Sequence, residues 1–190
     1  MSKPIGAFAW LNAEPGPKMI LEALKLFGET EVPGVGSNPT ILAWADELGA
    51  KVKTAYARWA AQWYDADSIP WCGLFMALVA KRAGKEPPVK FLAAKEWESF
   101  GHAPAGEACL GDVLVFDREG GGHVALYVGH DNLRYYCLGG NQGDRVSIIA
   151  KDRRTCTAVR RPDYINVPAN VRPVFMGPRV PGTPTSTNEA

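Results

Sequence analysis

Residues 68–79, which spell SIPWCGLFMALV, decide how the rest of the chain is interpreted. The apolar run after Pro70 predicts a buried helix whose first turn carries Cys72. Backbone N–H groups in the first turn of a helix have no intrahelical partners, and the helix dipole is positive at that end. Both effects favour the thiolate, which is the nucleophilic form of cysteine. The segment therefore predicts a nucleophile at position 72 if the rest of the chain supplies a base.

Size and composition are those of one ordinary globular domain. The chain has 190 residues, of which 46% are hydrophobic and 22% charged, so it can bury a core without disulfide bonds. A net charge of +1 does not favour electrostatic binding of nucleic acid. No apolar run reaches the roughly 18 residues of a membrane-spanning helix. We expect no nucleic-acid partner and no stable membrane insertion.

Cysteine usage indicates reduced thiols. The four cysteines form no C-x-x-C pair, which argues against a zinc finger or a redox motif. Residues 1–10 lack the pattern of an export signal, so we expect reduced thiols in the cytosol where the protein is made. Cys109, Cys137 and Cys156 do not precede a predicted helix, and we interpret them as small core residues.

The pattern of elements predicts an α+β fold, because helices come first and an antiparallel sheet second. Helices are predicted over residues 18–27, 39–48, 54–64, 72–84 and 91–100, with Asn38 as an N-cap and Gly49 as a helix end. Strands are predicted over residues 113–116, 124–128, 133–138, 145–149 and 157–161. We interpret residues 1–162 as a single domain, with 1–37 as a helical lead-in that is irregular up to residue 16. The Pro-rich residues 163–190 are expected to form a flexible tail, in which 171–176 could pack locally.

Two further residues complete a candidate catalytic site with Cys72. His123 begins a strand after three glycines, and Asn141 follows Gly139 and Gly140 at the end of the next strand. Antiparallel neighbours bring these strand ends together, so His123 and Asn141 can lie side by side. In such a set the imidazole takes the proton of the cysteine thiol, and the asparagine side chain fixes the tautomer of the ring. The resulting thiolate attacks amide and ester bonds.

Each of these residues has an alternative interpretation. Cys72 could be a core residue, and Asn141 beside two glycines could only form a turn. Asp144 is the alternative third member of the site. His102 and His130 are the competing histidines, in a loop and a hairpin turn. The aromatic residues Trp71, Trp97 and Tyr127 could line a substrate groove or belong to the core.

Four segments together resemble the CHAP and NlpC-type cysteine peptidoglycan hydrolases, and most of all their phage-endolysin branch. They are PWCGLF at 70–75, GDVLVF at 111–116, GHVALYVG at 122–129 and LGGNQ at 138–142. The resemblance extends from about Glu14 to about Pro162 and is specific as a set. One departure is Gly73, where the family more often has alanine.

The resemblance implies a papain-like fold, in which the nucleophile helix packs on a C-terminal antiparallel sheet. It implies that Cys72 is the nucleophile, His123 the base and Asn141 the orienting residue. Substrate contacts are expected from Trp71, Trp97, Gly140 and Gln142. No metal or other cofactor is implied, and the expected protein is a monomer that cleaves an amide bond of peptidoglycan as an endopeptidase or an amidase.

An endolysin of this kind accumulates in the host cytoplasm and reaches the wall after the membrane is opened. Two other hypotheses fit the same sequence. One is a bacterial toxin or secretion effector with the same chemistry. The other is a non-catalytic wall-binding or virion structural protein, against which the presence of all three candidate residues argues.

Overall fold

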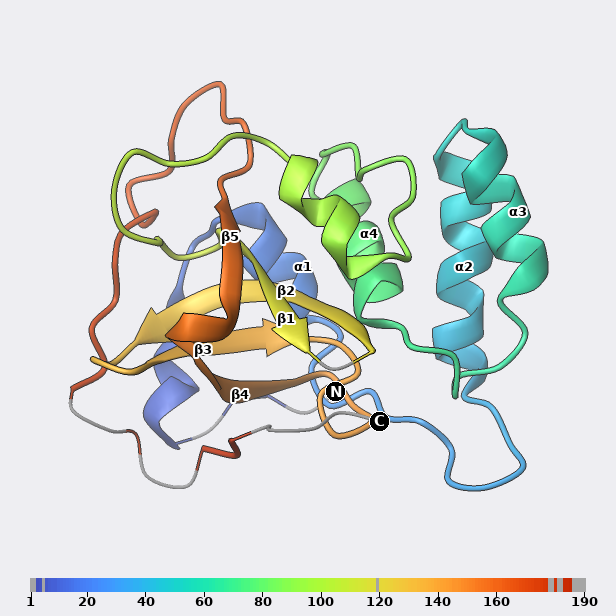
Figure 1. Cartoon of the computed structure of the whole chain (residues 1–190), viewed down its shortest axis with the longest axis horizontal. Helices are drawn as coiled ribbons and strands as arrows, with labels where there is room; N and C mark the ends of the chain where they lie inside the picture. The colour runs from blue at the N-terminus through green and yellow to red at the C-terminus, as the bar shows by residue number, and fades with distance from the viewer. Residues whose placement is uncertain (1–2, 5, 119, 178–179, 181–182, 186–190) are drawn as a thin grey trace.

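The computed structural model describes residues 3–4, 6–118, 120–177, 180 and 183–185 (Figure 1). Helical segments precede a five-stranded antiparallel sheet, which confirms the predicted α+β class. The helices are α1 (Lys18–Leu24), α2 (Pro39–Lys51), α3 (Ala55–Trp63) and α4 (Cys72–Arg82), and the 3-10 segments are η1 (Gly6–Ala13), η2 (Ala94–Ser99) and η3 (Arg153–Thr155). The strands are β1 (Val113–Arg118), β2 (Gly121–His130), β3 (Arg134–Gly139), β4 (Ser147–Asp152) and β5 (Cys156–Arg160).

The sheet places the start of β2 beside β1 and the end of β3. Its strand order is β4-β3-β2-β1-β5, so β2 is central and each hairpin joins neighbouring strands. His123 pairs with Phe116 of β1, and Leu126 pairs with Leu138 of β3. Because the ladder is antiparallel, residues just after β3 approach the first residues of β2.

Helix α4 lies at the centre of the hydrophobic core. Every residue from Cys72 to Ala80 is buried, because α4 packs against α1 and α2 on one side and β2 and β3 on another. Trp44 of α2 contacts both ends of the first turn, with its ring centroid 5.7 Å from Trp71 and 6.1 Å from Phe75. The buried helix predicted from residues 68–79 is confirmed.

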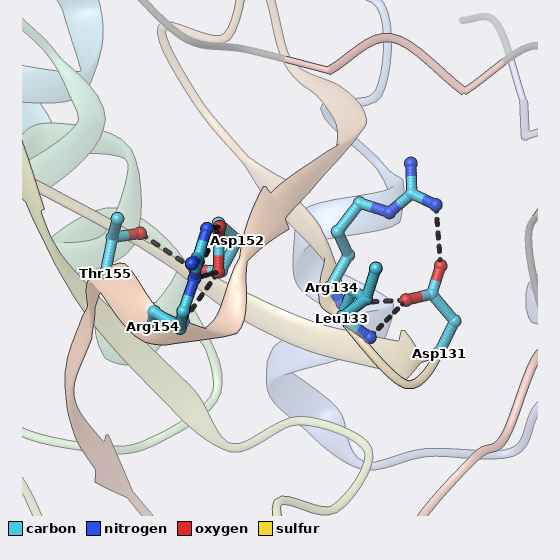
Figure 2. A network of polar contacts seen from close by, with 6 residues as sticks. All are labelled: Asp131, Leu133, Arg134, Asp152, Arg154 and Thr155. Carbon is cyan, nitrogen blue, oxygen red and sulfur yellow. Dashed lines mark hydrogen bonds and ion pairs between the residues drawn. The ribbon is translucent and has the colours of Figure 1, made fainter.

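Short polar networks close the turns at the far end of the sheet (Figure 2). Asp131 accepts hydrogen bonds from the backbone N–H groups of Leu133 and Arg134, at 2.8 and 2.7 Å, in the turn between β2 and β3. Asp152 accepts one from the N–H of Arg154 at the start of η3. Such Asx-type bonds satisfy backbone donors that the strands leave unpaired.

Several elements differ from the sequence prediction. Residues 6–13 form η1, where an irregular segment was expected. Gly49 does not end α2, which continues to Lys51. Gly49 instead allows α2 and α3 to pack closely, since a Cβ on residue 49 would lie 2.6 Å from the Cβ of Ala61 in α3. Asn38 does cap α2, accepting a hydrogen bond from the N–H of Thr40 at 2.8 Å.

The described part of the tail is hydrogen-bonded to strands of the sheet, and residues 171–176 pack locally, as the sequence analysis allowed. The N–H of His130 donates to Val174 O at 2.9 Å, and the N–H of Met176 donates back to His130 O at 2.9 Å. Farther along, the N–H of Ala150 donates to Pro184 O at 2.9 Å. Backbone hydrogen bonds between the tail and the strands do not require apolar side chains at regular intervals. The sequence of the tail therefore does not reveal these hydrogen bonds. The remaining residues of the predicted tail, 178–179, 181–182 and 186–190, lie outside the described residues.

An ion pair between α2 and α4 predicts a specific loss of stability in acid. Arg82 donates to both oxygens of Glu47, at 3.0 and 2.5 Å, and this hydrogen bonding holds the pKa of Glu47 at about 2, below its usual 4.5. A lowered carboxyl pKa stabilises the fold above about pH 4.5, and the contribution disappears as the pH falls towards 2. After allowance for solvent screening, we expect it to be about 1–2 kcal/mol.

Urea unfolding of wild type and Glu47→Gln, measured between about pH 6 and pH 2, tests this expectation. The difference in unfolding free energy between the two proteins should shrink as the pH falls. Glu86→Gln is the matched control. Glu86 also forms an ion pair with a residue of α4, Lys81, but the Glu86 side chain is 74% exposed. A difference for Glu47→Gln that stays constant over this range would contradict the prediction.

Candidate active site

Cys72 is the first residue of α4, and two side-chain hydrogen bonds hold the loop before it. Trp71 precedes the helix as its N-cap, and its indole N–H donates to Glu31 Oε1 at 2.6 Å. The hydroxyl of Tyr64 donates to Ile69 O at 2.7 Å. Burial raises the pKa of Glu31 and outweighs the opposing effect of its bond to Trp71. Cys72 itself is 5% exposed, at the helix end where amide N–H groups are not used within the helix.

Gly73 has a steric reason to lack a side chain. A Cβ at this position would lie 2.4 Å from the carbonyl oxygens of both Phe91 and Leu92. The loop that carries these carbonyls therefore lies directly against the first turn of α4. Alanine does not fit unless this backbone moves, so the glycine belongs to the local packing of this chain.

The end of β3 lies against the same first turn. A Cβ on Gly140 would come within 2.6 Å of the Trp71 ring and of the Phe75 Cβ. The absence of a side chain thus allows the backbone after β3 to touch the residue before Cys72. Gly140, expected to contact substrate, has a packing function in the structure.

His123 is held by Gln142. The imidazole is 1% exposed, and its Nε2 lies 3.0 Å from Oε1 of Gln142. The amide nitrogen of Gln142 donates to Cys137 O at 3.2 Å and to Ser147 O at 2.6 Å. Because both carbonyls require the donor end of the amide, the acceptor oxygen faces His123. Nε2 therefore carries the hydrogen, and a neutral ring has its basic lone pair on Nδ1.

Gly139 provides the space for this amide. A Cβ at Gly139 would lie 2.8 Å from Gln142 Oε1 and 2.8 Å from the Cβ of Ala125. The two glycines of the LGGNQ segment thus have separate functions. Gly139 accommodates the side chain that orients His123, and Gly140 accommodates the helix that carries Cys72.

Asn141 is buried, at 5% exposure, and follows the end of β3. Its φ of +54° lies in the left-handed region, which asparagine tolerates better than most residues. Strand β3 has already ended at Gly139, so the strand register that places residue 141 beside His123 does not extend that far. Gln142, one residue later, makes a hydrogen bond to His123, while the orienting function of Asn141 stays a prediction. Asp144, the alternative, is exposed and accepts a hydrogen bond from the N–H of Glu31 through its backbone oxygen, at 2.8 Å.

The aromatic residues proposed for a substrate groove are buried. Trp71, Trp97 and Tyr127 each have 0% exposure. The Trp97 indole donates to Phe91 O at 2.9 Å, so it supports the loop that lies against Gly73. These residues belong to the core, and because they are fully buried they offer no surface to a substrate.

The competing histidines lie elsewhere. His102 forms an exposed pair with Asp163, with 2.8 Å between Nδ1 and Oδ1. His130 is at the opposite end of β2 from His123, with its Nδ1 2.5 Å from the Tyr127 hydroxyl.

Two other cysteines have surroundings that disfavour the thiolate. Burial raises the pKa of Cys109, and it raises the pKa of Cys156 to about 11. A buried thiol in such surroundings is chemically inert. Neither residue begins a helix, which agrees with their interpretation as structural cysteines.

Comparisons with known proteins identify no relative: no family model matches the chain, and no curated protein matches it. Among the described residues, no group of three or more His, Cys, Asp or Glu side chains is arranged to hold a metal ion. In the same part of the chain, no helix has both the length and the apolar character needed to cross a membrane.

Proposed function

We propose that the protein is a cysteine-dependent hydrolase of amide bonds, with Cys72 as nucleophile and His123 as base. The observation that carries this proposal is the hydrogen bond between His123 Nε2 and Gln142 Oε1. It sets the ring tautomer and leaves Nδ1 as the basic nitrogen, and a cysteine–histidine mechanism needs one ring nitrogen held by an orienting group and the other able to act as base. Support also comes from the contact between Gly140 and Trp71, which brings the orienting segment against the helix that begins with Cys72.

The proposed chemistry uses these residues in the following order. Nδ1 of His123 takes the proton of the Cys72 thiol, and the thiolate attacks the carbonyl carbon of the amide. The N–H groups of the first turn of α4 are available to stabilise the oxyanion. His123 then gives its proton to the leaving amine as the C–N bond breaks. Water attacks the resulting thioester, which releases the acid and restores the thiol.

The proposed substrate is peptidoglycan, and the proposed fold is papain-like. Both rest on the resemblance of residues 70–75, 111–116, 122–129 and 138–142 to the CHAP and NlpC-type hydrolases. Three of the four segments contribute directly to the candidate site, through Cys72, His123 and Gln142. The setting that fits this substrate is an endolysin that accumulates in the host cytoplasm and lyses the cell through its wall.

Digestion of purified peptidoglycan by the wild-type protein tests the proposal. We expect soluble fragments whose masses each show the addition of one water per cut, since amide hydrolysis adds one water. The masses also distinguish cleavage within the stem peptide from cleavage between peptide and glycan. Binding without any release of fragments would contradict the proposal and favour a non-catalytic wall-binding protein.

A further inference from the structure

Helix α3 buries its small residues and exposes its large ones. Ala57 and Ala60 are fully buried, whereas Trp59 and Trp63 are 45% and 46% exposed. The close contact of Ala61 with Gly49 shows that α3 packs on α2 through its alanine face. Figure 1 shows α3 at the edge of the molecule, away from the sheet. A helix that served only to cover the core would bury its aromatic side chains and expose its small ones.

The two exposed tryptophans and the half-buried Tyr56 are in contact with one another. The rings of Trp59 and Trp63 are stacked, with centroids 5.2 Å apart and planes 17° apart, and the ring of Tyr56 lies 5.1 Å from that of Trp59. We name these three residues the aromatic platform. Arg58 and Gln62 lie exposed beside it. Neither indole N–H of Trp59 or Trp63 has a hydrogen-bond acceptor among the described residues.

The aromatic platform packs against the loop that lies beside the first turn of α4. The Tyr56 ring meets the Phe91 ring edge-on, at a centroid distance of 5.3 Å. The carbonyls of Phe91 and Leu92 lie against Gly73, the residue after Cys72. Tyr56 is therefore linked to the first turn of α4, where Cys72 lies, through the buried Phe91.

We propose that the aromatic platform binds the glycan strand of the peptidoglycan, and this rests on the proposed function. The C–H faces of amino-sugar rings pack on aromatic faces, while their hydroxyl and acetamido groups need hydrogen-bond partners. The indole N–H groups, Arg58 and Gln62 offer such partners at the rim of the platform. Exposed apolar patches rimmed by polar residues mark binding surfaces, and these polar groups favour a sugar over an apolar peptide.

Binding is tested in the Cys72→Ala background, so that the polymer stays intact. The probes are insoluble chitin, which is a peptide-free polymer of N-acetylglucosamine, and purified peptidoglycan. The change Trp59→Ala with Trp63→Ala should weaken sedimentation with both by at least about fivefold, the effect of losing two aromatic contacts. Replacement of both residues by Tyr should retain most of the binding. Phe175→Ala is the matched control, because Phe175 is 59% exposed and lies on the tail.

Cleavage assays separate glycan binding by the platform from the proposed hydrolase activity. With Cys72 present, the double alanine variant should cleave a soluble stem-peptide fragment at the wild-type rate and intact peptidoglycan more slowly. If wild type cleaves neither substrate, the proposed function fails, while chitin binding that depends on Trp59 and Trp63 still supports the platform. Unchanged chitin binding in the double variant would overturn the platform. Phosphatidylglycerol vesicles serve as a third probe, and a double variant that loses binding to these vesicles but not to chitin would also overturn the proposal and indicate a lipid-binding surface.

Discussion

Cys72→Ala should lower the rate of peptidoglycan hydrolysis by about a thousandfold or more, as removal of a catalytic nucleophile does in related mechanisms. Without Sγ no thioester can form, and His123 is left with only water to activate. The change removes one atom from a residue that is 5% exposed, so the fold should persist. Initial rates of fragment release measure the loss, and thermal unfolding of the same samples checks the fold.

Cys156→Ala is the matched control for this prediction. Burial raises the pKa of Cys156 to about 11, so its thiol should not act as a nucleophile near neutral pH. We expect wild-type activity from this variant. The assignment of the nucleophile is wrong if Cys72→Ala retains activity within about tenfold of wild type, since that loss is too small for a missing nucleophile.

Gln142→Ala should slow hydrolysis by about a hundredfold, towards the lower end of what positioned proton transfer contributes. The change removes the acceptor that selects the Nε2–H tautomer of His123. It also leaves the carbonyls of Cys137 and Ser147 without this donor, so some loss of stability is expected. A purely structural function would not alter the pH dependence of kcat/KM, whereas loss of an orienting bond to the base should alter it.

Asn141→Gly is the control for Gln142→Ala. Glycine adopts the positive φ of residue 141 without strain, and the change leaves the Gln142 amide intact. We expect a rate and a pH profile close to those of wild type. If Asn141→Gly loses activity while Gln142→Ala retains it, the orienting function belongs to Asn141 after all.

Local patterns were sufficient for the elements and for two members of the candidate site. Asn38 followed by proline predicted the start of α2, because an N-cap bond involves only neighbouring residues. The apolar run after Pro70 predicted a fully buried helix, and its first position is Cys72. The glycines before His123 marked the start of a strand. In each case the relevant energies arise within a few residues of the chain.

The third member of the site needed the tertiary structure. Sequence spacing predicted Asn141 beside His123, whereas the hydrogen bond that the structure shows at the imidazole is made by Gln142, after a left-handed residue 141. Only the positions of the Cys137 and Ser147 carbonyls show that the Gln142 amide turns its oxygen towards the imidazole. A side chain that folds back over Gly139 has no periodicity that a sequence pattern can reveal.

By itself, the sequence determined the α+β class, the buried helix that begins at Cys72 and the strand that carries His123. These follow from periodicity, caps and glycines, which act locally. Only the tertiary structure decided that Gln142 holds His123, that Gly73 is required by the Phe91 and Leu92 carbonyls, and that Trp71 and Trp97 are buried. It also decided that α3 packs through its alanines. These outcomes depend on which distant segments touch, and close packing between them decides which side chains fit.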